Sequence, residues 1–227
     1  MNCFLTGWAS PFPNSLDTTK LVAKYGTMEN ILKNAETIFP QNTADYPLET
    51  LSAWSMGTII ALGILGKVSV KKIILISPTL KFCCNDEMTA ELKLLKRNIA
   101  KNKEAALKPF AKICGVPDEK IETEPCIYST EELLAGLDFL EKTEISCKDT
   151  ACLVRDKNAP KISIICGEND KIIPLKSSLE VAEKLGVSPI IVPNGSHFDA
   201  FDYFLFLQNQ NEYPIEKCIT PVIPVRW

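Results

Sequence analysis

Three side chains of this sequence, Ser55, Asp170 and His197, could together supply a nucleophile, an acid and a base. The chain has a single histidine, so any general-base step that uses an imidazole must use His197. Each of the three residues follows a short apolar run, and an activated hydroxyl of this kind attacks acyl carbonyls. We predict that Ser55 is the nucleophile, that Asp170 orients the imidazole, and that His197 is the general base.

The serine lies in Ala53-Trp54-Ser55-Met56-Gly57, between an expected strand and an expected helix. A nucleophile at such a junction sits on a tight, strained turn, which needs small residues two positions to either side. Ala53 and Gly57 meet that need, although alanine replaces the more usual glycine. The alternative is an ordinary serine in a small-residue turn between a strand and a helix.

The acid and the base come from two later strand ends. A carboxylate at Asp170 can accept a hydrogen bond from the second ring nitrogen of His197 and so fix its tautomer. Glu168 and Asp202 are the rival acids, and a surface carboxylate or a helix cap is the alternative interpretation of Asp170. A histidine alone is more often structural, but its position before the last expected helix favours the catalytic interpretation.

Acyl transfer also needs two backbone N–H groups that meet the negative charge on the carbonyl oxygen. One is expected from Met56, the residue after the nucleophile, and the other from the loop that follows the first strand. In that loop Gly7 lets the backbone approach closely and Trp8 supplies the N–H. A core aromatic is the alternative for Trp8, and the two roles are compatible because the ring can line a pocket while the N–H acts.

The elements that would position these residues alternate along the chain. Short Ile- and Leu-rich runs bounded by Gly or Pro predict buried parallel strands over 2–6, 48–54, 72–77, 161–167 and 189–193. Helical patterns cover 17–25, 28–38, 57–66 and 175–186. This alternation predicts an α/β fold, with a mostly parallel sheet covered by helices on both faces.

One region breaks the alternation. No strand pattern occurs between 85 and 140, where we expect one long helix or two over 87–113 and another helix over 130–140. We therefore predict a core formed by 1–80 and 151–227, with a helical cap over 81–150 inserted in it. The tail after 211 carries three prolines and is expected to run extended.

Composition excludes several classes of protein. The 227 residues are 46% hydrophobic and 23% charged, which suits a packed core. A net charge of −3 does not favour nucleic-acid binding, and no apolar run has the roughly 18 residues of a membrane span. Nine cysteines without a Cys-x-x-Cys pair, and one histidine, favour neither a metal site nor a cofactor. We expect a cytoplasmic monomer with free thiols.

The expected cap contains a basic segment between Glu91 and Lys112. Its net charge is +5, whereas the whole chain carries −3. A solvated helix face is one interpretation, and a surface that attracts an acidic partner is the other. The seven basic residues of this segment are Lys93, Lys96, Arg97, Lys101, Lys103, Lys108 and Lys112.

Several segments together resemble the α/β-hydrolase superfamily over nearly the whole chain. More narrowly, the sequence is similar to the pimeloyl-acyl-carrier-protein methyl ester esterases of biotin synthesis (the BioH type). The segments that carry the resemblance are Thr6-Gly7-Trp8-Ala9, Trp54-Ser55-Met56-Gly57, Ser77-Pro78, Phe82, Asp86-Glu87, 134–140, 167–174 and Ser196-His197. The strands that precede the Gly7 loop in that family have no counterpart, so the resemblance implies an N-terminally shortened α/β-hydrolase fold.

The resemblance implies the same roles for Ser55, Asp170 and His197. It further implies that Trp8 and Met56 contact the acyl ester and that Phe110 of the cap is a pocket residue. We expect a serine carboxylesterase that hydrolyses the methyl ester of pimeloyl-acyl carrier protein, without a cofactor or metal and with the acidic carrier protein as partner. The alternatives are a general short-chain carboxylesterase or thioesterase, and a non-catalytic binding protein on a hydrolase scaffold.

Overall fold

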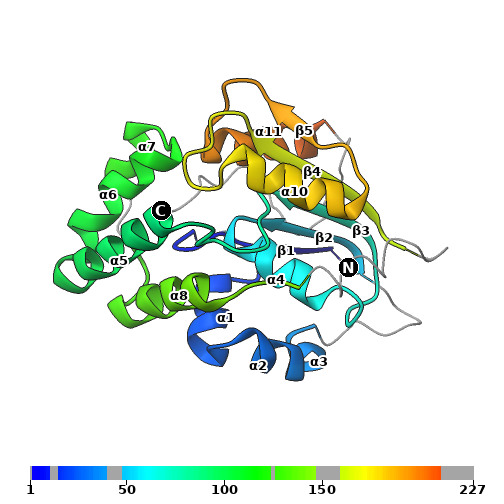
Figure 1. Cartoon of the computed structure of the whole chain (residues 1–227), viewed down its shortest axis with the longest axis horizontal. Helices are drawn as coiled ribbons and strands as arrows, with labels where there is room; N and C mark the ends of the chain where they lie inside the picture. Colours follow the sequence, from blue (N-terminus) through cyan, green and yellow to red (C-terminus); the bar gives the residue numbers. More distant parts are fainter. Residues whose placement is uncertain (1, 11–14, 40–47, 124–125, 147–158, 211–227) are drawn as a thin grey trace.

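The computed structural model describes residues 2–10, 15–39, 48–123, 126–146 and 159–210 (Figure 1). Five strands form one sheet in the order β1-β2-β3-β4-β5, and every neighbouring pair is parallel. Because every pair is parallel, all five carboxyl ends meet at one edge of the sheet. The strands are β1 (Asn2–Leu5), β2 (Leu48–Trp54), β3 (Val70–Ile76), β4 (Lys161–Gly167) and β5 (Ile190–Val192).

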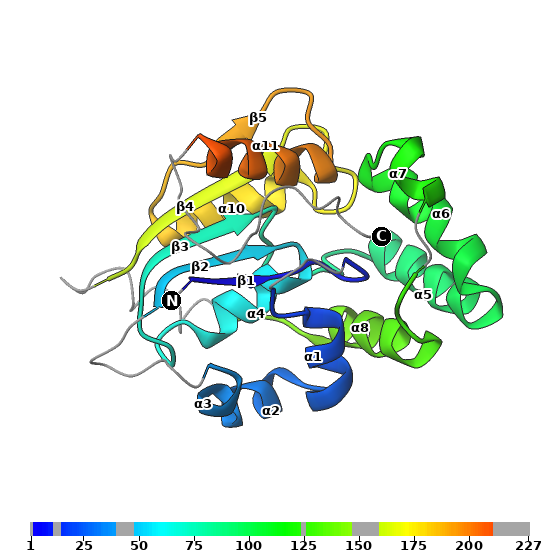
Figure 2. The same ribbon diagram turned by 180° about the vertical axis from the view of Figure 1, so that it is seen from behind.

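Helices cover both faces of this sheet. Helices α4 (Met56–Ile64) and α10 (Leu175–Leu185) pack on one face, and α11 (His197–Asn209) packs on the other, as Figures 1 and 2 show from opposite sides. Crossovers of one hand place α4 and α10 on the same face, and α11 returns on the far face after the last strand.

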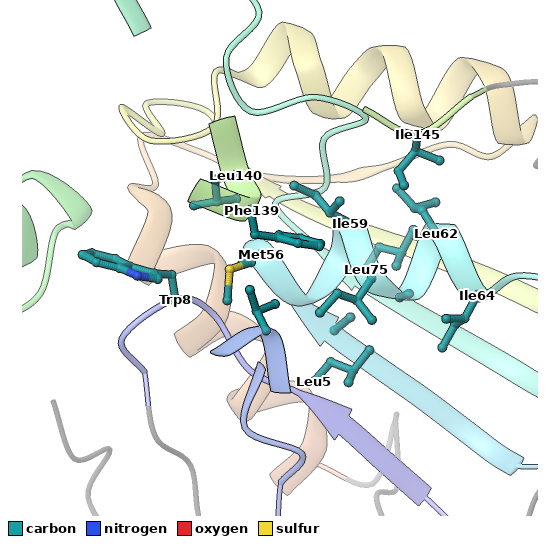
Figure 3. Packing of buried hydrophobic residues seen from close by; sticks show 14 of the residues in the cluster. Leu5, Trp8, Met56, Ile59, Leu62, Ile64, Leu75, Phe139, Leu140 and Ile145 are labelled. Atoms are coloured by element: carbon teal, nitrogen blue, oxygen red, sulfur yellow. The ribbon is translucent and has the colours of Figure 1, made fainter. Parts of the chain in front are cut away.

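The two faces have separate apolar cores, because alternate residues of each strand point to opposite sides. Leu51, Ala53 and Leu75 belong to the core beneath α4, part of which is drawn in Figure 3. Trp54 and Ile76 belong to the other core, where aromatic rings of α11 stack on the sheet. Apolar packing on both faces of the sheet therefore holds the ends of the strands in place.

Four helices lie beyond the carboxyl ends of the strands or beside them. They are α5 (Asp86–Lys101), α6 (Lys103–Cys114), α7 (Asp118–Thr123) and α8 (Thr130–Lys142). Helix α8 packs against both α5 and α1 (Thr18–Tyr25), so it joins the cap to the core. The remaining helices, α2 (Met28–Lys33) and α3 (Ala35–Ile38), follow α1.

The strands lie where the sequence predicts them, although β3 begins at Val70 and β5 is only three residues long. The pattern over 87–113 forms two helices, because Asn102 adopts extended backbone angles and its side chain accepts from the N–H of Ala105. The pattern over 28–38 is likewise divided at Asn34. The predicted extended tail after 211 lies outside the described residues.

No helix in the described part of the chain is both long and apolar enough to cross a membrane.

Candidate active site

Ser55 occupies a strained turn between β2 and α4. Its backbone angles are φ 54° and ψ −120°, a conformation that a residue with a side chain rarely adopts. The turn is held by three hydrogen bonds. The Ser55 N–H donates to the carbonyl of Ile76 at 3.0 Å, and the carbonyl of Ser55 accepts from the Thr58 hydroxyl at 2.6 Å and from the Thr58 N–H at 2.9 Å. The surrounding sheet and helix thus stabilise the geometry that presents the serine at the sheet edge.

Gly57 is required at this turn because α4 passes directly over the end of β1. A Cβ at this position would lie 2.5 Å from the carbonyl oxygen of Leu5 and 2.6 Å from that of Thr6. Both atoms belong to the backbone: the first ends β1, and the second is held by the Thr18 hydroxyl at 2.7 Å, so neither can easily give way. The small residue predicted two positions after Ser55 therefore has a definite steric reason.

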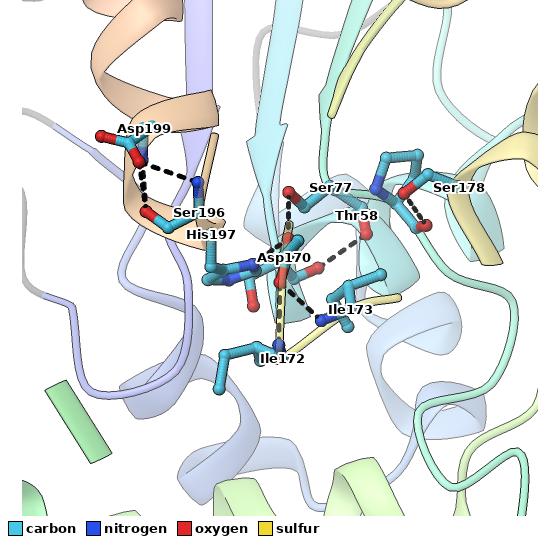
Figure 4. Close-up of polar contacts among 11 residues, drawn as sticks. Thr58, Ser77, Asp170, Ile172, Ile173, Ser178, Ser196, His197 and Asp199 are labelled. Carbon is cyan, nitrogen blue, oxygen red and sulfur yellow. Dashed lines mark hydrogen bonds and ion pairs between the residues drawn. The ribbon is translucent and has the colours of Figure 1, made fainter. Parts of the chain in front are cut away.

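The carboxylate of Asp170 accepts four hydrogen bonds (Figure 4). His197 Nδ1 lies 2.7 Å from Oδ2, and the Ser77 hydroxyl donates to the same oxygen at 2.8 Å. The backbone N–H groups of Ile172 and Ile173 donate to Oδ1, each at 2.8 Å. Burial on its own would raise the pKa of Asp170, but the charge of His197 and these hydrogen bonds outweigh it and hold that pKa below its ordinary value.

The two rival acids do not reach the imidazole. Glu168 is exposed and accepts instead from the N–H of Asn194 at 2.8 Å. Asp202 is exposed on α11. Among the described residues, Asp170 is the one carboxylate that hydrogen-bonds to His197.

His197 begins α11 and is almost fully buried. The Ser196 hydroxyl and the Asp199 carboxylate cap this helix reciprocally, and the ring of Trp54 stacks on the imidazole at a centroid distance of 5.4 Å. With Nδ1 held by Asp170, Nε2 is the ring nitrogen left to act on Ser55. Both Ser55 and His197 line one cavity, so the structure brings the three predicted residues together at the same sheet edge.

The loop after β1 passes against the nucleophile. A Cβ on Gly7 would lie 3.4 Å from the Cβ of Ser55. Buried threonines fix this loop: the Thr18 hydroxyl donates to the carbonyl of Thr6 at 2.7 Å, and the Ala9 N–H donates to the Thr19 hydroxyl at 3.0 Å. The loop is thus placed, and held rigidly enough, to present a backbone N–H beside Ser55.

No protein acceptor within the described residues takes a hydrogen bond from the backbone N–H of Trp8 or of Met56. These are the two groups that the sequence predicts for the oxyanion. Within the described part of the chain, nothing competes with a substrate oxygen for either group.

Comparison with known proteins agrees with this fold. No protein-family model matches the chain, and no curated protein is significantly similar to it in sequence. Solved structures do match. An esterase from Exiguobacterium antarcticum has a TM-score of 0.66 at 14% identity, covering 94% of this chain and 91% of that one.

Two other solved structures are similar to the same extent. A deep-sea metagenomic α/β hydrolase, MGS-M2, has a TM-score of 0.64 at 14% identity, covering 97% of this chain and 91% of that one. A bromoperoxidase from Bacillus anthracis has a TM-score of 0.62 at 16% identity, covering 92% and 91%. The chain has the α/β-hydrolase fold. In this fold the predicted nucleophile, acid and base lie at the ends of β2, β4 and β5.

In this fold, a cavity of about 800 Å³ lies between the sheet edge that carries Ser55 and His197 and helices α5 and α6. Its floor includes Gly7, Ser55 and His197. One face of α5 and one face of α6 form its walls, with contributing residues spaced three or four apart along each helix. The wall residues are Met88, Glu91, Leu92, Leu94, Leu95, Asn98 and Lys101 of α5, and Ala105, Ala106, Pro109, Phe110, Ile113 and Cys114 of α6.

The cavity is a long apolar groove with a polar far end. Lining residues run from Cys114 to Asn102, which is about 18 Å along the axis of α6. Cys114 marks the catalytic end, because a Cβ on the next residue, Gly115, would lie 2.5 Å from Cβ of Ser196. Lys101 and Asn102 lie at the other end, where α5 turns into α6.

The two predicted acyl contacts of the core differ in position. Trp8 lines the cavity with its ring, as does Phe110 of the cap, and the two rings meet edge to face at 5.1 Å. The side chain of Met56 is not among the lining residues. It is 1% exposed and lies in the apolar core near Trp8 and Phe139, so only the backbone of Met56 is available to a substrate (Figure 3). A contact between Met56 and an acyl ester would therefore have to come from its backbone N–H.

Three of the seven basic residues predicted to bind a carrier protein make polar contacts within this chain. Lys96 pairs with Asp138 and Glu141 of α8, and its side chain is only 16% exposed. Lys103 donates to the backbone carbonyl of Tyr128 at 2.6 Å, and Lys112 pairs with Asp118 at 3.0 Å. The four that remain exposed, without an ion pair among the described residues, are Lys93, Arg97, Lys101 and Lys108.

Sequence reasoning missed the role of Ser77. This residue follows β3 with φ 48°, and its hydroxyl donates to the oxygen of Asp170 that also receives His197. Its position at the end of a central parallel strand is the signal that could have identified it, since the ends of such strands share one edge with the catalytic groups.

Proposed function

We propose that this chain is a serine hydrolase that cleaves carboxylic esters through Ser55, His197 and Asp170. The observation that carries the proposal is the buried His197–Asp170 pair, with 2.7 Å between Nδ1 and Oδ2, in the same cavity as a serine held at φ 54°. Such strain persists only where the surrounding structure imposes it, and it clusters at functional sites.

The reaction follows from the chemistry of these groups. Nε2 of His197 takes the hydroxyl proton of Ser55 as Oγ attacks the ester carbonyl, and the N–H groups of Trp8 and Met56 meet the resulting oxyanion. The C–O bond to the alcohol then breaks, and His197 gives its proton to the departing oxygen. A water molecule, deprotonated by His197, attacks the acyl-serine and releases the acid and the free serine.

The finer proposal is that the substrate is the methyl ester of pimeloyl-acyl carrier protein. The apolar groove between α5 and α6 suits a linear acyl chain whose ester lies at Ser55. Lys101 at the far end of the groove, with Lys93, Arg97 and Lys108 on the same two helices, would attract an acidic carrier protein. Such attraction raises the association rate and weakens as salt rises.

The test compares the wild type with Ser55→Ala on pimeloyl-carrier-protein methyl ester at low and high salt. We expect release of free acid by the wild type, slowed by salt, and a loss of several orders of magnitude in Ser55→Ala. Circular dichroism of Ser55→Ala controls for folding. Wild-type turnover by that variant would contradict the catalytic proposal.

Simple p-nitrophenyl esters separate the alternatives. Hydrolysis of these esters without hydrolysis of the carrier-linked ester would retain the catalytic residues and point to a general short-chain esterase or thioesterase. Failure of Ser55 to react with a fluorophosphonate would favour a non-catalytic binding protein on this scaffold.

A further inference from the structure

The ring of Trp8 connects the loop beside the nucleophile to the cap. Its indole N–H donates to the carbonyl of Leu133 on α8 at 2.9 Å. The ring also packs edge to face against Phe110 of α6, and the residue is 5% exposed. One side chain of the predicted oxyanion loop is therefore enclosed by two helices of the cap.

Gly136 of α8 provides the space for this ring. A Cβ on Gly136 would lie 2.8 Å from Nε1 of Trp8 and closer still to Cδ1. Real Cβ atoms do not approach other atoms so closely, so a side chain at position 136 would push the ring away from α8 and strain its hydrogen bond to Leu133. Glycine in a helix interior weakens the helix relative to alanine, so its presence in α8 has a packing reason here.

The backbone of the same loop is fixed from the opposite side. Thr18 and Thr19 of α1 hold the residues on either side of Trp8, through the carbonyl of Thr6 and the N–H of Ala9. Ala9 has a positive φ of 55°, so the loop has little freedom to absorb a shift of its neighbour. A ring displaced on the cap side must therefore rotate the Trp8 peptide on the core side.

We propose that Gly136 is a positioning residue for the oxyanion hole: α8 sets the place of the Trp8 indole and thereby the direction of the Trp8 backbone N–H. The inference rests on the proposed function, because the N–H matters only if an oxyanion forms beside Ser55. It also makes the cap part of the catalytic apparatus, since α8 holds the ring by both a hydrogen bond and a close contact.

The test is a double-mutant cycle of Gly136→Ala and Trp8→Ala with a p-nitrophenyl ester as substrate. Gly136→Ala alone should lower kcat about tenfold, with KM changed less than twofold, because a misdirected donor loses part of what a deleted donor loses. In the Trp8→Ala background the same substitution should leave kcat unchanged, because the ring that transmits the shift is absent.

Thermal unfolding gives a second readout, because Gly136→Ala should change the melting temperature in opposite directions in the wild type and in Trp8→Ala. Gly136→Ala should lower the melting temperature of the wild type, since the new methyl group meets the indole. It should raise the melting temperature of Trp8→Ala, since alanine then only improves the helix. A lowered melting temperature in both backgrounds would show that Gly136 serves some other contact and would overturn the inference.

Phe139→Leu is the matched control. Phe139 is buried on the same helix but does not line the active-site cavity, so this change should lower the melting temperature and leave kcat unchanged. An active wild type whose kcat is unaffected by Gly136→Ala would overturn this inference alone. A wild type without Ser55-dependent hydrolysis would overturn the proposed function and the inference together.

Discussion

The catalytic edge of the sheet and the cap above it are stabilised by different kinds of contact. At the edge, backbone approaches backbone: Gly57 lies over the carbonyls that end β1, and a Cβ on Gly167 would lie 2.5 Å from the carbonyl oxygen of Gly195. In the cap, helices pack through side chains and ion pairs such as that of Lys96 with α8. Leu94 and Ile113 are half exposed there beside the groove.

This difference determines how much each region allows its sequence to vary. A backbone contact admits glycine and almost nothing else, and a positive φ at Ser55 or Ser77 needs a fixed surrounding. A helix–helix contact accepts many apolar pairs of similar volume. Substitutions should therefore have abrupt, chemical effects at the edge and graded, energetic effects in the cap.

Asp170→Asn should give the largest effect. The amide can still accept from the backbone N–H groups of Ile172 and Ile173, so the fold should persist. It cannot stabilise an imidazolium or hold the required tautomer, and we expect kcat to fall about 10⁴-fold. Steady-state kinetics on a p-nitrophenyl ester, with circular dichroism as the folding control, measures this loss. A loss below tenfold would mean that His197 is oriented by something else.

The same difference explains what the sequence could predict. Ser55, Asp170 and His197 are predictable because each follows an apolar strand whose end needs particular small neighbours within a few positions. Both the strand and its neighbours are visible in a short window of sequence. The order of the elements then places the three residues at one edge.

The contacts that were not predicted join residues far apart in the chain. Lys96 finds its carboxylates on α8, and Ser77 finds Asp170 across the sheet edge. The sequence gives the net charge of a lysine-rich segment, but it does not show which carboxylates its lysines contact. The sequence likewise does not say which way the Met56 side chain points, because that depends on how α4 is rotated about its axis. These outcomes are decided by packing, which no local window contains.

Lys96→Met tests how much an ion pair between two helices of the cap contributes to the stability of the fold. The substitution removes the cation paired with the partly buried Glu141 and one of the two cations beside Asp138, which keeps Lys142 at 3.5 Å. Because the pair is neither fully buried nor free in water, we expect the free energy of unfolding to fall by about 2 kcal/mol, with kcat on a small ester nearly unchanged. Urea denaturation measures the former. A stability equal to that of the wild type would show that α5 and α8 associate through apolar packing alone.

Ser77→Ala should lower kcat, but much less than Asp170→Asn does. Loss of the hydroxyl removes one of two donors to Oδ2 of Asp170 and should lower kcat about tenfold through a less well-held imidazole. The hydroxyl helps to lower the pKa of Asp170, so its removal raises that pKa. A carboxyl with a depressed pKa stabilises the fold above its unfolded pKa and loses that stabilisation as the pH falls through its folded pKa.

The acid-unfolding midpoint of Ser77→Ala should therefore move to higher pH than that of the wild type. The matched control is Ser178→Ala, because the Ser178 hydroxyl is also buried but donates to the carbonyl of Pro78 at 3.0 Å, away from Asp170. This control should not change kcat. Equal losses of kcat in the two variants would assign the effect to packing and not to the carboxylate.

Arg97→Gln should have the smallest effect, although Arg97 is the immediate neighbour of Lys96. Its guanidinium is exposed and has no ion pair among the described residues, so water replaces the charge at little cost. We expect the free energy of unfolding to change by less than about 0.5 kcal/mol and hydrolysis of a small ester to stay the same.

Because a helix turns by about 100° per residue, the adjacent cations Lys96 and Arg97 face different surroundings: Lys96 is fixed between carboxylates and Arg97 faces solvent. Only the second is free to meet an acidic partner, so Arg97→Gln should slow hydrolysis of a carrier-linked ester at low salt and lose that effect at high salt. A large loss of stability in Arg97→Gln would instead place Arg97 inside the cap.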